Sequence, residues 1–198
     1  MSELLSTVYL VRHGETAWSL TGQHTGLTDL PLTERGRANA ARLGARLRAL
    51  KLAKVLVSPL QRALQTCELA GLQPEAQIEP DLVEWNYGRY EGRTTAEIRA
   101  LQPDWQLFRD GCPEGESPAQ IGARADRVVT LLRRLPGDCL VFSSRHFLAV
   151  LAARWLEMAP ANGRFFPLST ASLSVLGYNH SPTEPVIELW NDDHHLEN

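Results

Sequence analysis

The sequence predicts a three-layer α/β/α sandwich, with a mostly parallel sheet between helices on both faces. Short runs of aliphatic residues alternate with longer segments of helical periodicity, which is the pattern of consecutive βαβ units. The 198 residues, 43% of them hydrophobic, suffice for one substantial core. No internal repeat or low-complexity linker divides the chain, so we expect one domain over residues 1–198.

Composition excludes several classes of partner. A net charge of -3 and a pI of about 6.1 argue against nucleic-acid or membrane binding through a general basic surface. No apolar run is long enough to span a bilayer, and no signal peptide is evident, so we expect a cytoplasmic protein. The three cysteines, Cys67, Cys112 and Cys139, are odd in number and widely spaced, which suits neither a disulfide framework nor a zinc site. We therefore expect all three to be reduced thiols. The oligomeric state stays open, a homodimer included.

The first predicted strand covers residues 8–11 and ends in Arg12-His13-Gly14. We expect Gly14 to permit a sharp exit that leaves His13 at the carboxyl end of the strand, where open α/β sheets bind ligands. Imidazole attacks phosphorus only when neutral, and a neighbouring cation such as Arg12 favours the neutral form. His13 is therefore a candidate nucleophile, although so short a motif alone more often marks a histidine on a surface loop.

The next elements follow from periodicity. Residues 16–33 are rich in hydroxyls, glycine and amides and are expected to form an ordered loop. Thr33 is the predicted N-cap of a helix with apolar residues every three or four positions and arginines on its solvated face. A strand over 54–58, a helix over 60–70 and a short strand over 77–79 complete this half.

Two capping boxes, at Thr94 and Ser117, begin helices in the second half, and the segment 105–117 between them reads as irregular. The apolar run 139–142 is typical of a central parallel strand. A helix and an edge hairpin should follow it, over 147–156 and over 171–178 with 186–190. The helix that begins at Ser117 is expected to direct four arginines into solvent: Arg124, Arg127, Arg133 and Arg134.

From about Thr7 to Trp190 the chain resembles the histidine phosphatase family, the phosphoglycerate mutase-like enzymes, because several separated motifs recur in order. After Arg-His-Gly come Ser-Pro-Leu-Gln-Arg at 58–62 and Glu-x-x-Tyr-Gly-x-Tyr-Glu-Gly at 84–92. The stretch Arg-Asp-Gly-Cys-x-x-Gly-Glu at 109–116 favours the sedoheptulose-bisphosphatase branch. The resemblance implies a phosphoglycerate mutase-like fold.

The resemblance also implies roles for individual residues. His13 would attack phosphorus, Arg12 and Arg62 would hold the phosphoryl oxygens, and Glu84 would protonate the leaving alcohol. This chemistry is reasonable, because a guanidinium fits phosphate oxygens and a carboxyl group beside a phosphate dianion favours its protonated form. No metal or cofactor is implied. Further residues would line the pocket: Ser19, Gln23, Thr25, Gly26, Tyr87, Ser144 and Arg145.

The chain departs from the family pattern at the end of the strand over 139–142. Ser144 stands where the family has its second catalytic histidine, Arg145 where it has glycine, and Ala149 where this branch has arginine. Loss of one preorganised donor typically costs about 3 kcal/mol of transition-state stabilisation. Arg145 could supply a replacement charge, or it could strain a turn that needs glycine.

The favoured function is therefore metal-independent hydrolysis of a small phosphorylated metabolite, such as a sugar phosphate, through a phosphohistidine and at a rate reduced by Ser144. One alternative is a catalytically impaired protein that binds or senses phosphate ligands, supported by the substitutions at 144, 145 and 149. The other is a phosphoglycerate mutase-type phosphotransferase, which is less favoured because family mutases generally carry longer insertions than this compact chain.

Overall fold

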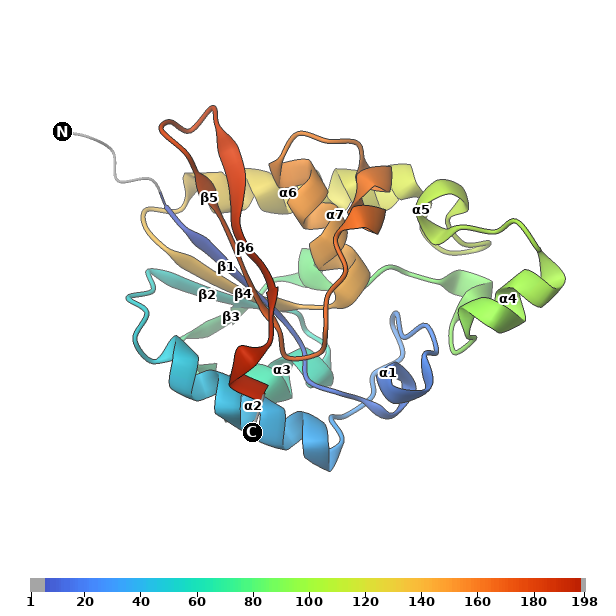
Figure 1. Cartoon of the computed structure of the whole chain (residues 1–198), viewed down its shortest axis with the longest axis horizontal. Helices are drawn as coiled ribbons and strands as arrows, with labels where there is room; N and C mark the ends of the chain where they lie inside the picture. The colour runs from blue at the N-terminus through green and yellow to red at the C-terminus, as the bar shows by residue number, and fades with distance from the viewer. Residues whose placement is uncertain (1–5, 197–198) are drawn as a thin grey trace.

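The computed structural model describes residues 6–196, and its centre is one sheet with strand order β3-β2-β4-β1-β5-β6 (Figure 1). The strands β3, β2, β4 and β1 pair in parallel, and β5 pairs antiparallel with both β1 and β6, so the predicted mostly parallel sheet with helices on both faces is confirmed. The strands are β1 (Val8–Arg12), β2 (Lys54–Val57), β3 (Ala76–Ile78), β4 (Cys139–Ser143), β5 (Leu173–Tyr178) and β6 (Pro185–Asp192).

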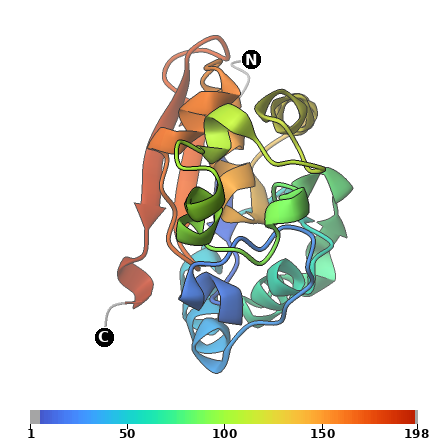
Figure 2. The ribbon, with the colours of Figure 1, turned by 90° about the vertical axis from the view of Figure 1, so that its right-hand side faces the viewer.

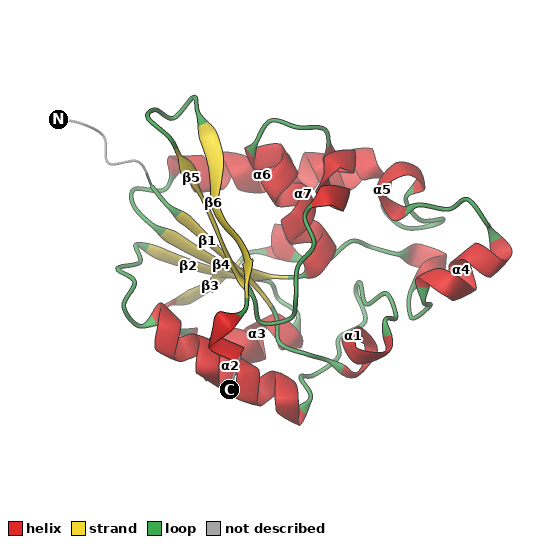
Figure 3. Cartoon of the chain, in the orientation of Figure 1, coloured by secondary structure: helices red, strands yellow, loops and turns green. Residues whose placement is uncertain are grey.

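Helices cover both faces of the sheet (Figures 1 and 3). On one face lie α2 (Glu34–Leu47) and α3 (Gln61–Leu69), and on the other α6 (Pro118–Arg134) and α7 (Arg145–Trp155). Alternation along β1 supplies both cores: Leu10 packs with the α6 and α7 cluster, whereas Val11 packs with the α2 and α3 cluster. Within the described residues, no helix is long and apolar enough to cross a membrane.

The shorter elements gather beyond the carboxyl ends of the parallel strands. There α1 (Ala17–Thr21) lies next to the segment between β3 and α6, which carries α4 (Thr95–Leu101) and α5 (Leu107–Asp110), as both views show (Figures 1 and 2). Five 3₁₀ helices complete the described chain: Gln73–Glu75, Pro80–Leu82, Gly88–Tyr90, Pro160–Phe165 and His194–Leu196.

Strand register brings two motifs together. β1 and β4 pair in parallel with Arg12 opposite Ser143, and the His13 amide donates to the Ser143 carbonyl at 2.9 Å. The segment after β1 therefore leaves the sheet beside Ser144, the N-cap of α7. This edge is the carboxyl end of the sheet, where the ligand site was predicted.

Local signals in the sequence were read well, with three exceptions. The capping boxes at Thr94 and Ser117 are present. The loop over 16–33 contains helix α1, and the irregular segment over 105–117 contains helix α5; both are too short to show periodicity.

The third exception is Arg124, which was expected in solvent and is buried instead. Its Nε and Nη2 donate to the Glu116 carboxylate at 2.9 and 2.7 Å, and its Nη1 donates to the carbonyls of Asp81 and Val83. The segment before α6 folds back over this face of the helix and supplies those acceptors. A buried guanidinium held by so many acceptors is a structural tie rather than a surface charge.

Candidate active site

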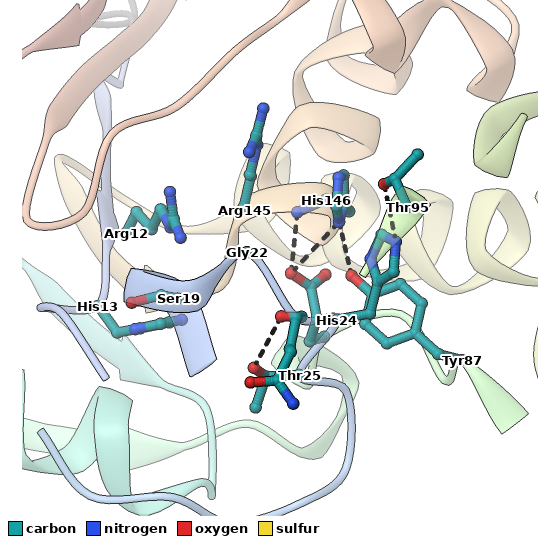
Figure 4. Close-up of a pocket in the computed structure, with 12 residues that line it drawn as sticks. Arg12, His13, Ser19, Gly22, His24, Thr25, Tyr87, Thr95, Arg145 and His146 are labelled. Carbon is teal, nitrogen blue, oxygen red and sulfur yellow. Dashed lines mark hydrogen bonds and ion pairs between the residues drawn. The ribbon is translucent and has the colours of Figure 1, made fainter. Parts of the chain in front are cut away.

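A hollow of about 210 Å³ opens at the carboxyl ends of β1 and β4 (Figure 4). It draws side chains from β1, the segment around α1, the segment before α4 and the start of α7. The residues that line it are Arg12, His13, Ser19, Gly22, Gln23, His24, Thr25, Glu84, Tyr87, Thr95, Arg145 and His146.

His13 is held as a neutral imidazole with one free ring nitrogen. Its side chain is 4% exposed, and Nδ1 lies 2.7 Å from the Gly14 carbonyl, which only accepts hydrogen bonds, so Nδ1 carries the proton. In the neutral ring the lone pair is then on Nε2. Burial, then the positive charges of Arg62 and Arg12, hold the His13 pKa well below its ordinary value.

Gly14 is required for a different reason than the sequence suggested. A Cβ on Gly14 would lie 2.7 Å from the Gly36 carbonyl oxygen in α2, closer than carbon and oxygen can approach. The Gly14 amide also donates to the Thr66 hydroxyl at 2.9 Å. Close packing against α2, together with this bond to α3, fixes the exit from β1.

Two arginines flank His13, the half-buried Arg12 and the buried Arg62, and each has a buried donor without a partner in the described chain. Arg12 Nη1 donates to the Leu168 carbonyl at 2.6 Å, and Arg62 donates to the carbonyls of Thr28 and Gly26 at 3.0 and 2.7 Å. The Nε atoms of both arginines are buried without a hydrogen-bond partner in the described chain. Burial lowers the pKa of Arg12 to about 10, with Arg145 the next cause, and burial also lowers that of Arg62.

Glu84 joins the hollow to the start of α7. Its Oε1 accepts the amides of Trp85 and Phe147, both at 2.8 Å, and its Oε2 accepts the His146 amide at 3.0 Å. Ser144 makes no side-chain capping bond, and the Glu84 carboxylate instead satisfies two of the amides that a helix leaves open at its N-terminus. The carboxylate is thereby fixed at the wall of the hollow.

The loop after α1 is tied down from outside the hollow. Glu91 Oε1 accepts the amides of Gly26 and Thr28 at 2.8 and 3.1 Å, and a Cβ on Gly26 would lie 2.5 Å from the Trp85 carbonyl. Gly26 and Arg62 thus stand behind the lining and shape it. Ser19 reaches the hollow, but its hydroxyl also completes the capping box of α1.

Four lining residues escaped the sequence prediction: Gly22, His24, Thr95 and His146. His146 Nδ1 lies 2.5 Å from the Tyr87 hydroxyl, and His24 Nε2 lies 3.3 Å from the Thr95 hydroxyl (Figure 4). Burial, then the charge of Arg145, lowers the His24 pKa to about 4 and holds the His146 pKa well below its ordinary value. His146 follows the altered motif by two residues and could have been found, whereas no periodicity marks His24.

A second hollow, of about 240 Å³, adjoins the first and shares His24, Thr95 and His146 with it. Trp105, Leu107 and Phe108 give this side an apolar and aromatic wall. The remaining lining residues are Arg99, Gln106 and Arg164. The combined site is polar around His13 and more apolar away from it.

Ser144 and Arg145 take different places. Ser144 is 1% exposed, its hydroxyl has no partner in the described chain, and it does not line the hollow. Arg145 is exposed, begins α7 and does line it. Arg145 is not among the residues with positive φ, so the backbone here does not need glycine and the expected strain is absent.

Comparisons with known proteins agree with this arrangement. A family model described as histidine phosphatase superfamily (branch 1) matches residues 8–193. An acid phosphatase of Mycobacterium tuberculosis is 44% identical over 175 residues, 86% of each chain. A sedoheptulose 1,7-bisphosphatase of Saccharomyces cerevisiae is 36% identical over 191 residues, 80% of this chain and 70% of that one.

Among solved structures, that of the open reading frame Rv3214 from Mycobacterium tuberculosis superposes with a TM-score of 0.90 at 40% identity, over 96% of this chain and 99% of that one. The phosphoserine phosphatase of Entamoeba histolytica, in complex with 3-phosphoglyceric acid, gives a TM-score of 0.82 at 25% identity, over 96% and 99% of the two chains. Because the family model matches residues 8–193, nearly the whole chain, this protein belongs to branch 1 of the histidine phosphatase superfamily.

Proposed function

We propose that this chain hydrolyses small phosphomonoesters through a phosphohistidine formed on His13. The observation that carries the proposal is the state of His13: a neutral imidazole, with its proton on Nδ1 and its lone pair on Nε2, between two arginines. The buried Nε donors of Arg12 and Arg62 have no partner in the described chain, and an unsatisfied buried donor calls for an acceptor. Phosphoryl oxygens are such acceptors.

In the first step, Nε2 of His13 forms a bond to phosphorus while the bond from phosphorus to the ester oxygen breaks. Arg12 holds the phosphoryl oxygens during this transfer, and the positive charge of Arg62, which stands behind the lining, stabilises them electrostatically. Glu84 gives its proton to the leaving oxygen, which departs as the alcohol. Its Oε2 accepts a single backbone amide, whereas Oε1 accepts two, so Oε2 has the greater free capacity to carry that proton.

In the second step, water attacks the phosphohistidine. Glu84, now ionised, takes a proton from the water as the oxygen bonds to phosphorus. The bond between phosphorus and Nε2 breaks, its electron pair returns to His13, and inorganic phosphate leaves. Each group thus regains its starting protonation state, as turnover requires.

The substrate class follows from the lining. Gln23, Thr25 and Tyr87 offer hydrogen bonds to hydroxyl groups close to the phosphoryl site, and the adjoining hollow with Trp105 and Phe108 offers room for the rest of the alcohol. We assign the protein to phosphorylated metabolites with a hydroxylated carbon chain, of which sugar phosphates are the leading class. The name of one relative, the sedoheptulose 1,7-bisphosphatase, supports this assignment.

One observation favours a second candidate, a phosphate-ligand binding protein with little turnover. The position of the family's second histidine holds Ser144, whose hydroxyl is buried away from the hollow. Loss of one such donor typically costs about a hundred-fold or more in rate. The retained His13 and Glu84 favour the slow-enzyme reading over the binding one.

The test is phosphate release from p-nitrophenyl phosphate and a panel of sugar phosphates, with chelator present. His13→Ala is the inactive comparison, and His180→Ala, an exposed histidine on the β5–β6 turn, is the matched control. Release that His180→Ala keeps and His13→Ala loses supports the proposal, as does phosphate trapped on His13 by rapid quenching. Equal inactivity of parent and His13→Ala, with phosphate esters still bound, favours the binding protein, and a moved phosphoryl group without free phosphate favours a mutase.

A further inference from the structure

Among the residues that the structure describes, Arg145 has no counter-ion, unlike other arginines near α7. Arg124 is paired with Glu116, Arg127 with Asp81 and Arg154 with Asp126. Arg145 makes no hydrogen bond or ion pair with any residue that the structure describes, although it lines the hollow together with Arg12. Two guanidinium groups on one small hollow repel each other unless an anion lies between them.

No carboxylate of the lining is free to be that anion. Glu84 is the acidic residue among the lining side chains, and its two oxygens already accept three amides, two of them from the start of α7. The histidines of the lining, His13, His24 and His146, are buried or partly buried and have lowered pKa values, so none adds a positive charge near neutral pH. Arg12, Arg145 and the nearby Arg62 leave the site with an excess of positive charge, which is the complement of a phosphate dianion.

We infer that Arg145 holds the phosphoryl oxygens of the substrate and supplies the positive charge that the family pattern places on its second histidine. The inference rests on the proposed function. Ser144 cannot supply that charge, because it is neutral and its hydroxyl lies outside the hollow. The charge has therefore moved one residue along the chain, onto a longer side chain at the first position of α7.

This replacement has a signature in the pH profile. A histidine in this role holds its charge only below its pKa, whereas a guanidinium stays charged through the whole working range. The phosphatase reaction of this chain should therefore lack an alkaline limb that comes from loss of the second histidine's proton. Restoring the histidine should bring that limb back.

The alternative role for Arg145 is to read a second anionic group on the alcohol part of the substrate, next to Arg99 and Arg164 of the adjoining hollow. The two roles differ for a substrate with one anionic group. p-Nitrophenyl phosphate has no second anion, so it needs Arg145 only if that residue contacts the transferred phosphoryl group.

The experiment compares the parent, Arg145→Ala, Arg145→Lys and the double variant Ser144→His/Arg145→Gly. Arg134→Ala is the matched control, because Arg134 is exposed on α6 and lines no part of the site. The kinetic constants kcat and KM are measured on p-nitrophenyl phosphate and on a sugar bisphosphate between pH 5 and 9. Affinity for inorganic phosphate is measured by calorimetry, and thermal unfolding confirms that each variant is folded.

We expect Arg145→Ala to lower kcat/KM on both substrates by about a hundred-fold, mainly through kcat, and to weaken phosphate binding. Arg145→Lys should recover part of the loss, since it keeps the charge but not the forked geometry. The double variant should recover activity and gain an alkaline limb. Arg134→Ala should match the parent.

Two results would overturn the inference: an unchanged kcat/KM for Arg145→Ala on p-nitrophenyl phosphate, or a loss confined to the bisphosphate. Failure of the proposed function looks different, because parent and His13→Ala would then be equally inactive. In that case phosphate affinity still decides: an unchanged affinity in Arg145→Ala refutes the role of Arg145, and a weakened one upholds the contact without turnover.

Discussion

Lowering the pH from 7 to 5 should destabilise this protein through its buried histidines. The pKa of His24 falls from its ordinary value to about 4 in the folded protein, chiefly because of burial and then because of the charge on Arg145. The pKa values of His13 and His146 are lowered in the same direction, again first by burial. Each of these rings takes up a proton more readily in the unfolded chain.

The sign and size follow from that difference. Because the folded-state pKa lies below the unfolded one, the unfolded chain binds the extra proton first as the pH falls, and stability is lost below about pH 6.5. Between about pH 6.5 and pH 5, an interval of about 1.5 pH units, the His24 ring is protonated in the unfolded chain but not in the folded protein. Over this interval His24 lowers the free energy of unfolding by about 2 kcal/mol. His13 and His146 add to this loss, against a total stability of about 5 to 15 kcal/mol for a typical domain.

Denaturation by urea at pH 7 and pH 5 measures the loss, for the parent and for His24→Gln. Glutamine keeps a hydrogen bond for Thr95 but has no titrating ring, so the variant should lose about 2 kcal/mol less than the parent between the two pH values. His180→Gln, at the exposed β5–β6 turn, should lose as much as the parent. Equal losses in His24→Gln and the parent would show that His24 is not held neutral by burial.

Four further outcomes test other parts of the structure. Arg124→Ala should lower the free energy of unfolding by about 3 to 5 kcal/mol, because it leaves the Glu116 carboxylate without its buried partner, and a loss under 1 kcal/mol in urea would contradict this. Gly14→Ala should cost about 1 to 3 kcal/mol through overpacking against α2, and thermal unfolding of a stable variant would disprove the clash. Glu84→Gln should slow hydrolysis of an alkyl phosphate by about a hundred-fold or more. It should slow hydrolysis of p-nitrophenyl phosphate less, since p-nitrophenolate leaves without a proton, and equal losses on the two substrates would show that Glu84 is not the general acid. Because the His13 pKa is lowered, the pH profile of kcat/KM should show no inflection near pH 6.5 from His13. An inflection there that persists when each of the other histidines is replaced would have to come from His13 and would argue against a neutral, buried nucleophile.

Much of the fold could be predicted because its signals are local. β1 and β4 are short apolar runs, and the helices after Thr33, Thr94 and Ser117 begin with caps that operate over three residues. Helix α1 was missed because its five residues have no buried side chain and so leave no apolar pattern. Locally encoded features were thus predicted, and features created by packing were not.

The candidate site divides in the same way. The segment that carries Arg12 and His13 could be located from one strand and its exit, but the sequence could not show that Arg62 would bind loop carbonyls and stand behind the lining. Arg124 looked like any charge on a helix face, because its acceptors come from residues 81–84 and from Glu116. Burial depends on which distant segments fold back, and helical periodicity does not report this.

Because Glu84 contacts the start of α7, the charge of its carboxylate can be measured through the backbone amides of that helix. Its oxygens accept the amides of His146 and Phe147, so any proton that Glu84 gains weakens the electrostatic hold on those two amides at once. In a ¹⁵N-resolved NMR spectrum the two resonances would act as built-in indicators, moving together when the carboxylate changes charge. A pH titration that monitors these two amide resonances of α7 would then follow the protonation state of Glu84 without any substrate or dye.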